Sequence, residues 1–530
     1  MRYLLLRIKK FSSYFFFDNK NVQKIKSTDI EIDFKQKKSF DVFSFELNTP
    51  KKKFLSDIKK IKKQISLGNT YQVNYTVKGK FDLFGSVSSF LTSLLFNQSA
   101  EYSTFINTGN NLVFSFSPEL FLSIKGKNIE SIPMKGTGKR GFDLISDLSN
   151  QYNLQRSEKN QAENVMIVDL IRNDLGKVCK TGSINVPELY SVKKLESLFQ
   201  MTSKVTGKLK KDVSLSQILK STFPCGSVTG APKIKTMEII KELEKEERGI
   251  YTGSIGLFTK NKKVFNVPIR TITLNRQSGR GEIGLGSGIV WDSDPEEEYN
   301  EVNLKSEFLT KETGYFELFE TMKIDNGNII FLEEHLERLK SSSEFFLFRF
   351  DRKKIRKKLN KICESNPKGF FRLKLQIDKT GNFKTELLEY PYLPGEIKII
   401  VSEIRIDPLN KFQYFKTTNR KLYEDEFQIY STKGFLDVLF LNNKEELMEG
   451  TFTNLFIRKR ELWYTPPLSA GVLPGIYRNY FLKRSDNVRE LPIHINDLYE
   501  ADELILTNSL RGEIKVDAIY FDEQEFKTFD

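Results

Sequence analysis

The stretch Pro133-Met134-Lys135-Gly136-Thr137 sets a lysine between a proline and a glycine. Proline fixes its own φ angle, and glycine lets the backbone approach a ligand closely. A lysine held between two such residues is predicted to be a positioned nucleophile. A basic surface hairpin is the competing interpretation, which composition alone favours.

The chain is long enough for several folded domains. Its 530 residues are 39% hydrophobic, and chains of this length form about two to four domains. Lys and Arg number 83 against 69 Asp and Glu, a formal net charge of +14. Both signs are interspersed, for example over 233–248, so a compositional bias explains the excess better than a phosphate-binding groove. We therefore expect no nucleic-acid partner, whereas anionic small substrates are compatible with the charge.

Cysteine spacing and hydropathy indicate the compartment. The three cysteines, Cys179, Cys225 and Cys363, follow neither metal nor disulfide spacing, which favours a reducing cytoplasm. Residues 1–10 superficially resemble a signal peptide, but their apolar run is short and interrupted by charge. No apolar stretch reaches the roughly 18 residues of a membrane span, so we expect a cytoplasmic protein without a membrane partner.

Periodicity predicts a mixture of helices and strands. Apolar residues at helical spacing predict a helix over 54–67, and alternation predicts a strand over 71–77. A helix buried on most sides is predicted over 162–176, and a pair of strands over 112–124. A strand is also expected over 264–274, with Arg270 at its centre.

A glycine-rich segment precedes another predicted helix. Pro232 is expected in the first turn of this helix, which Gly249 ends. Its predicted apolar face consists of Ile234, Met237, Ile240 and Leu243. Free N–H groups at such a helix start form an anion site, and a plain helix cap is the alternative. The alternating glycines of 284–288 weaken a strand and therefore indicate close backbone approach to another group.

Carboxylates occur where a metal could bind. Glu298 and Glu301 are three residues apart on a predicted helix and therefore share one face. With Glu163 they could supply oxygen ligands to Mg²⁺. A solvated acidic face and structural ion pairs are the alternatives.

The first half resembles one enzyme family in motif after motif. Residues from about 50 to 310 resemble the chorismate-utilising enzymes, the group of anthranilate synthase and aminodeoxychorismate synthase component I. The motifs are Tyr71-Gln72-Val73-Asn74, Ser117-Pro118-Glu119, Pro133-Met134-Lys135-Gly136-Thr137, Asp169-Leu170-Ile171-Arg172-Asn173-Asp174, Gly230-Ala231-Pro232-Lys233, Gly286-Ser287-Gly288-Ile289-Val290 and Glu298-Tyr299-Asn300-Glu301.

This resemblance implies specific roles. Anthranilate synthases have alanine at the position of Lys135, whereas aminodeoxychorismate synthases have a lysine that attacks the chorismate ring and is displaced by ammonia. Lys139 and Arg140 could keep this lysine neutral. Glu119 matches the general acid/base, and Glu163, Glu298 and Glu301 match the magnesium ligands. The implied substrate-binding residues are Thr137, Gly230, Ala231, Tyr251, Arg270, Gly286, Gly288 and Lys305.

One position departs from the family pattern. Relatives commonly carry histidine where Phe199 stands, a position linked by resemblance to pyruvate elimination in anthranilate synthases. Phenylalanine there favours an enzyme that keeps the enolpyruvyl group.

The second half resembles a different family. Residues from about 314 to 515 resemble class IV pyridoxal-phosphate enzymes, which include branched-chain and D-amino-acid aminotransferases and aminodeoxychorismate lyase. The motifs are Leu332-Glu333-Glu334-His335-Leu336-Glu337-Arg338-Leu339, Lys416-Thr417-Thr418-Asn419-Arg420, Leu447-Met448-Glu449-Gly450-Thr451, Gly471-Val472-Leu473-Pro474-Gly475-Ile476 and Leu506-Thr507-Asn508-Ser509.

Pyridoxal 5'-phosphate needs a linking lysine, an acid beside its pyridine nitrogen and a phosphate cup. By resemblance Lys416 is the lysine and Glu449 the acid, with Lys433 a rival for the lysine. The implied phosphate cup consists of Arg338, Leu473, Gly475, Ile476, Thr507, Asn508 and Ser509.

Together the resemblances imply an α/β (α+β) protein with two domains. Residues 1–310 would adopt the chorismate-utilising fold of two large β-sheets flanked by helices, and residues 314–530 a class IV two-subdomain fold. The expected enzyme is bifunctional, aminating chorismate and then releasing pyruvate to give 4-aminobenzoate for folate. No Cys-His-Glu glutaminase constellation is present, so ammonia would come from solution or a separate glutamine amidotransferase subunit. The class IV resemblance also implies a possible homodimer.

Two alternatives stay open. An anthranilate or isochorismate synthase-like domain fused to an amino-acid aminotransferase would carry the same motifs. A basic nucleic-acid-binding or scaffold protein with decayed sites is the alternative from another class.

Overall fold

A computed structural model of the chain describes residues 2–5, 13–18, 21–26, 39–98, 100–311, 313–390, 392–393 and 395–529. The segment over 1–10 that resembles a signal peptide lies mostly outside the described residues. The contacts divide the chain into two compact units, Met1–Arg140 with Ser149–Tyr315 and Gly141–Leu148 with Phe316–Asp530. Each unit is described by itself.

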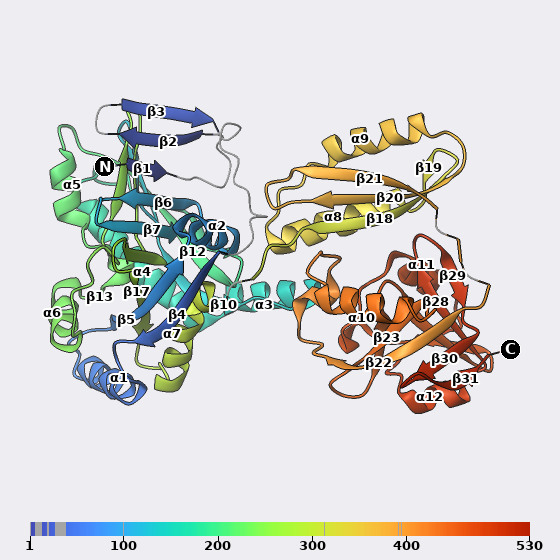
Figure 1. Cartoon of the computed structure of the whole chain (residues 1–530). Helices are drawn as coiled ribbons and strands as arrows, with labels where there is room; N and C mark the ends of the chain where they lie inside the picture. Colours follow the sequence, from blue (N-terminus) through green and yellow to red (C-terminus); the bar gives the residue numbers. More distant parts are fainter. Residues whose placement is uncertain are drawn as a thin grey trace. The chain divides into compact units, whose positions relative to one another are not determined.

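The described residues of the first unit form a ten-stranded sheet with the order β13-β5-β17-β16-β7-β6-β1-β2-β3, and β4 also pairs with β5 (Figure 1). Its strands are β1 (Arg2–Leu5), β2 (Ser13–Asp18), β3 (Asn21–Lys26), β4 (Phe40–Leu47), β5 (Gln72–Gly85), β6 (Tyr102–Asn107), β7 (Asn111–Ser117), β13 (Gly230–Ala231), β16 (Thr271–Asn275) and β17 (Arg280–Ile289). The predicted strand over 71–77 is therefore part of β5.

A second sheet of this unit has seven strands among the described residues, in the order β10-β12-β9-β8-β15-β14, with β11 paired to β12. Its strands are β8 (Leu120–Lys125), β9 (Asn128–Ile132), β10 (Met134–Lys139), β11 (Asn185–Lys194), β12 (Leu198–Lys208), β14 (Ile255–Phe258) and β15 (Lys263–Asn266). The predicted pair of strands over 112–124 is confirmed as β7 and β8, one in each sheet.

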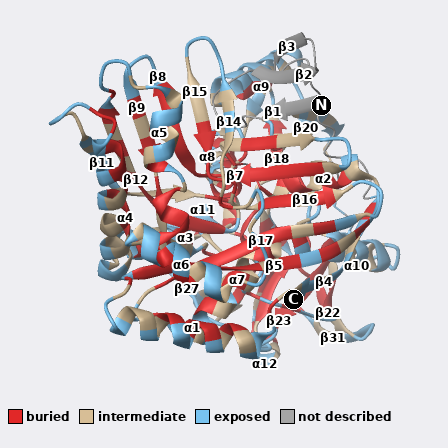
Figure 2. Ribbon diagram, turned by 90° about the vertical axis from the view of Figure 1, so that its left-hand side faces the viewer, coloured by how far each residue is buried: buried red, intermediate tan, exposed pale blue. Residues whose placement is uncertain are grey.

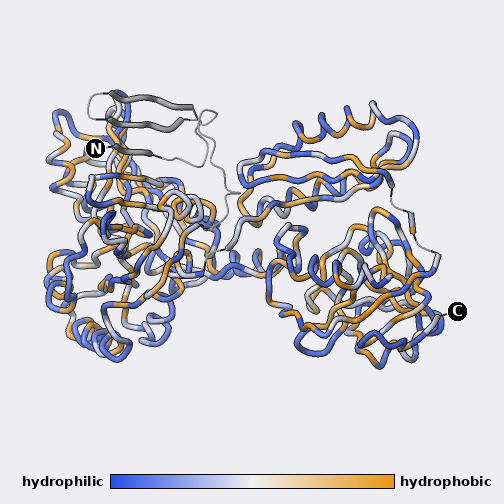
Figure 3. Tube along the Cα trace, in the orientation of Figure 1, coloured by the Kyte–Doolittle hydropathy of each residue, from blue (hydrophilic) through white to orange (hydrophobic). Residues whose placement is uncertain are grey.

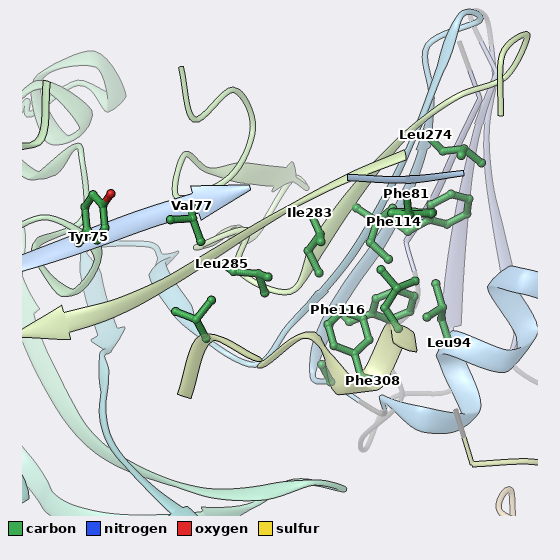
Figure 4. Packing of buried hydrophobic residues seen from close by; sticks show 14 of the residues in the cluster. Tyr75, Val77, Phe81, Leu94, Phe114, Phe116, Leu274, Ile283, Leu285 and Phe308 are labelled. Carbon is green, nitrogen blue, oxygen red and sulfur yellow. The ribbon is translucent and has the colours of Figure 1, made fainter. Parts of the chain in front are cut away.

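Helices cover both sheets. They are α1 (Lys51–Ser66), α2 (Val87–Asn97), α3 (Leu144–Arg156), α4 (Glu158–Gly176), α5 (Leu215–Thr222), α6 (Lys233–Leu243) and α7 (Pro295–Thr310). The predicted helices over 54–67 and 162–176 are confirmed as α1 and α4. Against the ten-stranded sheet, Leu94 of α2 and Phe308 of α7 pack near Phe114 and Phe116 of β7 (Figure 4). In Figure 2 the central strands of this sheet are largely buried, whereas α1 alternates between buried and exposed residues.

Two sheets also build the second unit. Its described residues form a four-stranded sheet, β19-β18-β20-β21, and a ten-stranded sheet, β27-β26-β25-β24-β23-β22-β30-β31, in which β28 pairs with β25 and β29. The strands are β18 (Leu318–Asp325), β19 (Asn328–Ile329), β20 (Phe370–Ile377), β21 (Phe383–Glu389), β22 (Lys398–Ile406), β23 (Asp437–Asn442), β24 (Leu447–Gly450), β25 (Asn454–Lys459), β26 (Leu462–Thr465), β27 (Val488–Glu490), β28 (Glu503–Asn508), β29 (Gly512–Lys515), β30 (Ala518–Phe521) and β31 (Gln524–Thr528). The helices are α8 (Leu332–Phe346), α9 (Arg352–Ser365), α10 (Lys421–Ser431), α11 (Ile476–Arg484) and α12 (Ile495–Glu500).

Two local predictions were wrong. The predicted strand over 264–274 is broken between β15 and β16, where Arg270 adopts a φ of +50°. Helix α6 ends at Leu243 rather than near Gly249. It buries Thr236 and Ile239, whereas Ile234 of the predicted apolar face is 79% exposed.

Hydrophobic and hydrophilic residues alternate through both units (Figure 3). Among the described residues, no helix is both long and apolar enough to cross a membrane.

Candidate functional site

The first unit contains a cavity of about 280 Å³, lined by residues of both sheets and of α4 and α7. Predicted site residues that line it are Glu119, Lys135, Thr137, Glu163, Tyr251, Arg270, Gly286, Gly288, Glu298, Glu301 and Lys305. They come from segments more than 180 residues apart in the chain, and folding brings them to one place. Most of these side chains are charged or polar, which suits a small anionic ligand.

Lys135 lies on β10, directly after Pro133 and Met134. Gly136 has a φ of +97°, and a Cβ there would lie 3.0 Å from the Asn160 amide oxygen. The lysine Nζ lies 3.7 Å from an oxygen of Glu163. The backbone at 133–136 therefore places the amine inside the cavity, beside a carboxylate.

Gly288 of β17 makes room for this amine. A Cβ at Gly288 would lie 1.8 Å from the Lys135 Nζ and 2.9 Å from the Gln72 amide nitrogen. A Cβ at Gly286 would lie 2.8 Å from the Tyr75 carbonyl oxygen. The glycines in this strand thus allow the close approach that their spacing predicted.

Glu119 is a buried carboxyl group in the cavity wall. Its Oε1 accepts a hydrogen bond from the Ser227 hydroxyl at 2.6 Å and one from the Met134 N–H at 3.4 Å. Burial raises the pKa of Glu119 to about 7, although the Ser227 hydrogen bond opposes the shift. A carboxyl group with this pKa can both give and take a proton near neutral pH.

The three predicted magnesium ligands line the same cavity, each with a different partner. Besides the contact of Glu163 with Lys135, Glu298 accepts a hydrogen bond from the Ser293 hydroxyl at 2.6 Å and Glu301 pairs with Lys305 at 2.6 Å. No three Asp, Glu, His or Cys side chains of the described residues are grouped closely enough to hold a metal ion.

One carboxylate oxygen is nevertheless available to a cation. Glu298 Oε2 is buried and has no hydrogen-bond partner in the described part of the chain. Burial and the neighbouring Glu301 raise the pKa of Glu298. A buried carboxylate that repels its neighbour fits a hard divalent cation, so these residues are chemically suited to Mg²⁺.

Cationic groups on another wall could bind carboxylates of a ligand. Arg270 donates to the Gln98 side chain, and burial lowers the pKa of its guanidinium to about 10. Lys305 donates to the Gly286 carbonyl oxygen at 2.8 Å. Burial also raises the pKa of the Tyr251 hydroxyl, so this group remains a neutral donor.

The structure places some predicted residues elsewhere. Gly230 and Ala231 pair with β5 as β13 and do not line the cavity. Arg140 donates to the Leu195 carbonyl oxygen at 2.7 Å, and neither it nor Lys139 lines the cavity. The expected effect of these two cations on Lys135 stays a prediction.

Phe199 also does not line the cavity. It is fully buried with Leu154 and Met201, whereas the next residue, Gln200, lines the cavity and donates to the Gly136 carbonyl oxygen at 2.9 Å. Successive residues of β12 point to opposite faces of the sheet. Phe199, where relatives commonly carry histidine, is thus a residue of the hydrophobic core here.

Several lining residues were not predicted. They are Asn74, Pro118, Lys159, Asn160, Gln200, Ser227, Val228, Ile269, Gly284 and Leu285, together with Met134 and Gly136 beside Lys135. Asn74, Pro118 and Ser227 stand in or next to motifs, so motif membership could have identified them. Lys159 has no such signal, and only the start of α4 brings it to the cavity.

In the second unit, Lys416 lies beside the start of β18, with which its neighbour Thr417 forms a β-bridge. The Phe319 N–H donates to the Lys416 carbonyl oxygen at 3.1 Å, and the Lys416 Nζ lies 4.8 Å from the centre of the Phe319 ring. Burial and the nearby Arg338 and Arg420 lower the pKa of the Lys416 amine to about 7. A lysine with this pKa is substantially neutral at physiological pH and can act as a nucleophile or base.

The rival lysine has the opposite environment. Lys433 is exposed and pairs with Glu523, which raises its pKa. An exposed, charged lysine is a poor nucleophile, so the environment favours Lys416.

Glu449 of β24 is buried close to Lys416. Its Oε2 accepts hydrogen bonds from the Leu473 N–H at 2.8 Å and from the Asn454 amide at 3.2 Å. Its Oε1 is buried without a partner among the described residues. Burial raises the pKa of Glu449 to about 7. An unpaired buried carboxylate oxygen beside a neutral lysine fits the pyridine nitrogen of pyridoxal 5'-phosphate.

Arg338 of α8 is held by a buried acid. Its Nε donates to Glu320 at 2.8 Å and its Nη2 at 2.5 Å. His335 also bonds Glu320, at 2.7 Å, and burial lowers its pKa. Although burial opposes it, Arg338 and His335 hold the pKa of Glu320 at about 2. Glu320 thus fixes the orientation of the guanidinium through two of its nitrogens.

The other residues predicted for the phosphate cup have different surroundings. The Leu473 amide supports Glu449, as described, whereas Gly475 is the N-cap of α11, which starts at Ile476. Thr507 precedes Asn508, the last residue of β28, whose side chain accepts from the N–H groups of residues 510 and 511. Ser509 donates to the Thr321 carbonyl oxygen at 3.4 Å. A helix start with free N–H groups and a held arginine fit a phosphate.

Comparison with known proteins agrees with this two-part arrangement. Residues 14–311 match the family model of chorismate binding enzymes, and residues 317–519 match that of class IV amino-transferases.

Curated relatives are similar to this chain over about half of its length. Over 249 residues the chain is 39% identical to aminodeoxychorismate synthase component 1 of Bacillus subtilis (strain 168), covering 47% of this chain and 53% of the relative. It is 40% identical over 273 residues to a probable chloroplastic aminodeoxychorismate synthase of Oryza sativa subsp. japonica, covering 50% of this chain and 30% of the relative. It is 41% identical over 214 residues to anthranilate synthase component 1 of Saccharolobus solfataricus, covering 40% of this chain and 50% of the relative. The chain thus spans about half or less of the length of these relatives.

Proposed function

Because the chain belongs to the chorismate binding enzymes and carries a class IV amino-transferase domain, we propose that it makes 4-aminobenzoate from chorismate in two steps. The first unit replaces the C4 hydroxyl of chorismate with an amino group. The second unit removes pyruvate from the resulting aminodeoxychorismate. The product would serve folate biosynthesis.

The observation that carries the first step is the amine of Lys135 inside the cavity. Sequence identity alone does not separate the alternatives, since relatives named for aminodeoxychorismate and for anthranilate synthesis are 39–41% identical to this chain. A lysine at this position matches the pattern of aminodeoxychorismate synthases, whereas anthranilate synthases have alanine. The lysine is therefore the feature that favours amination at C4.

The cavity supports a displacement at the chorismate ring. The Lys135 amine, whose Nζ lies 3.7 Å from Glu163, loses a proton to solvent before attack. As the nitrogen bonds to the ring, the C4 hydroxyl leaves and Glu119 protonates it to water. Ammonia then displaces the lysine and leaves an amino group at C4, which restores the free lysine.

Charged side chains would hold the substrate during this step. Arg270 and Lys305 lie in the cavity wall, where they would bind carboxylates of the substrate. Glu163, Glu298 and Glu301 would hold Mg²⁺, which offsets the negative charge of a substrate carboxylate.

The second unit supports proton removal from C4. When bound, pyridoxal 5'-phosphate supplies an electron sink for the charge that develops as the proton leaves. Lys416, with a pKa of about 7, takes that proton. Glu449 would accept the hydrogen bond from the pyridine nitrogen through its unpaired Oε1, while Arg338 and the start of α11 would hold the phosphate.

Ammonia would come from a separate glutamine amidotransferase subunit, and the second unit could pair with a second copy of the chain. The described cysteines are all unpaired, which supports a cytoplasmic location.

A product assay tests the whole function. The purified chain receives chorismate, Mg²⁺, ammonium and pyridoxal 5'-phosphate, and the products are separated by chromatography. We expect 4-aminobenzoate and pyruvate in equal amounts. Anthranilate, or keto-acid turnover with an amino donor and no 4-aminobenzoate, would support the alternative fusion and overturn this function.

A further inference from the structure

Two arginines of the second unit have buried nitrogens without hydrogen-bond partners. They are Arg372 of β20 and Arg511, which follows β28. The unpartnered atoms are Nε of Arg372 and both Nε and Nη1 of Arg511, counted within the described residues. Neither residue has a role in the function proposed above.

The two guanidinium groups are close enough to repel each other. Burial and the charge of Arg372 lower the pKa of Arg511, while Tyr390 opposes the shift. Buried polar groups in proteins are normally paired, and two unpaired like charges cost free energy. Such a pair is stabilised when an anion binds between the groups.

The loop that carries Arg511 is anchored to the four-stranded sheet. Ser509 donates to the Thr321 carbonyl oxygen at 3.4 Å, and the Tyr390 hydroxyl donates to the Leu510 carbonyl oxygen at 3.1 Å. The Arg511 N–H donates to the Asn508 side chain at 2.8 Å. These bonds hold the arginine in place rather than leaving it on a free loop.

Arg372 lies on the face of the four-stranded sheet that the Lys416 amine contacts. Along β18, Phe319 and Lys323 are half-buried and point to the same side, since alternate residues share a face. The Lys416 Nζ lies over the Phe319 ring, and Arg372 is the cross-strand partner of Lys323. Phe319 and Lys323 are four residues apart, which is about 13 Å along a strand.

Both the charge and the position limit the anion. Arginine pairs best with carboxylate or phosphate, which accept two parallel hydrogen bonds. The phosphate of the cofactor already has Arg338 and the start of α11 near Lys416. A carboxylate of the substrate is the remaining anion that must be held.

We infer that Arg372 and Arg511 form the carboxylate subsite of the second unit, for a substrate whose carboxylate lies across a ring from its reacting amine. This inference rests on the proposed function and deepens it. An α-amino acid carries its carboxylate one carbon away from the amine, whereas aminodeoxychorismate carries one across the ring. The pair thus selects a cyclic para-amino acid such as aminodeoxychorismate.

The test measures binding of two probes to the full chain loaded with pyridoxal 5'-phosphate. 4-Aminobenzoate has the carboxylate, and 4-aminobenzamide replaces it with a neutral group of the same shape. The cofactor absorbance reports the binding, so a probe bound in the first unit does not contribute. We expect at least about tenfold tighter binding of 4-aminobenzoate, as for charge-assisted hydrogen bonds.

Variants test which residues cause the preference for 4-aminobenzoate over 4-aminobenzamide. Arg511→Met and Arg372→Met should each reduce the preference for 4-aminobenzoate about tenfold or more and leave 4-aminobenzamide binding unchanged. Arg511→Lys should restore part of it, because lysine keeps the charge but not the two-bonded geometry. Arg489→Met is the control, since Arg489 is an exposed arginine that bonds only backbone oxygens of residues 486 and 488. Thermal unfolding and cofactor content show whether each variant is folded.

Failure of the proposed subsite and failure of the proposed function give different experimental results. If wild type releases pyruvate from aminodeoxychorismate but both arginine variants keep the full preference, the subsite is wrong. If wild type releases no pyruvate, the proposed function is wrong, and the probe preference still decides the subsite. Both variants should also raise KM for aminodeoxychorismate more than they lower kcat.

Discussion

The Lys135 amine lies so close to Gly288 that a Cβ at this glycine would be 1.8 Å from the Nζ. A side chain at 288 would therefore displace the amine from its position beside Glu163. Gly288→Ala should lower aminodeoxychorismate formation by about 100-fold, as expected for misplacement of a reacting group by about 1 Å. Formation of this product from chorismate and ammonium measures the effect.

Gly314→Ala is the matched control for Gly288→Ala. A Cβ at Gly314 would meet no atom within 4 Å, so this variant should keep full activity. Wild-type activity of Gly288→Ala would contradict the placement of Lys135.

Substitution of Lys135 and substitution of Lys416 should change the products in different ways. Lys135→Ala should lose aminodeoxychorismate formation, because the attacking amine is gone, yet still convert added aminodeoxychorismate to 4-aminobenzoate. Lys416→Ala should accumulate aminodeoxychorismate and lose the cofactor absorbance near 420 nm, on the order of the band expected for a lysine-linked cofactor. Chromatography and absorbance measure both results.

Lys433→Ala controls for the loss of a lysine in the second unit, since Lys433 is exposed and pairs with Glu523. It should behave as wild type. If Lys433→Ala, rather than Lys416→Ala, lost the absorbance band, the assignment of Lys416 would be wrong.

The two steps should depend on pH in opposite directions. The pKa of Glu119 is raised to about 7, so its protonated form, the acid for the leaving hydroxyl, is lost as pH rises through 7. The pKa of Lys416 is lowered to about 7, so its neutral form increases over the same range. At a fixed concentration of free ammonia, we expect the first step to slow and the second to accelerate between about pH 6 and 8.

Separate assays of the two steps across this range check the pH dependence. Glu119→Gln should lower the first step by about 10²- to 10⁴-fold and remove the fall in its rate above about pH 7, without changing the second step. Parallel profiles for the two steps would contradict these roles.

Glu449→Gln tests the acid beside the cofactor. The substitution keeps the size and the acceptor for the Leu473 N–H but removes the charge that holds the pyridine proton. The second step should fall by about 100-fold, as when one preorganised electrostatic partner is removed, with the first step unchanged. Glu403→Gln, at an exposed position, should leave pyruvate release from aminodeoxychorismate unaffected.

Removal of Mg²⁺ should affect the first step and not the second. A chelator should stop the first step, because no cation then offsets the charge of Glu298 beside a substrate carboxylate, and should not affect the second. Glu298→Gln should raise the Mg²⁺ concentration needed for half-maximal rate at least about tenfold, since Glu298 Oε2 is the unpaired buried oxygen. A first step that runs at full rate in the chelator would exclude the metal.

Local patterns predicted the helices and strands well where one periodicity held over many residues. The amphipathic run in α1 and the alternation in β5 are examples. The prediction over 264–274 failed because Arg270 adopts a left-handed conformation, which its neighbours in the sequence do not signal. The predicted apolar face of α6 was wrong because packing buries Thr236 and Ile239 instead of Ile234.

The sequence by itself determined which chemical groups are available: a lysine between proline and glycine, a buried helix with carboxylates, and a second set of lysine, acid and arginine. Only the tertiary structure decided which of them meet. It placed Gln200 rather than Phe199 in the cavity, because neighbouring strand residues face opposite sides. It buried Lys416 and exposed Lys433, and desolvation is what makes one of two similar lysines neutral. Charge and pKa depend on surroundings from distant parts of the chain, and local sequence does not specify those surroundings.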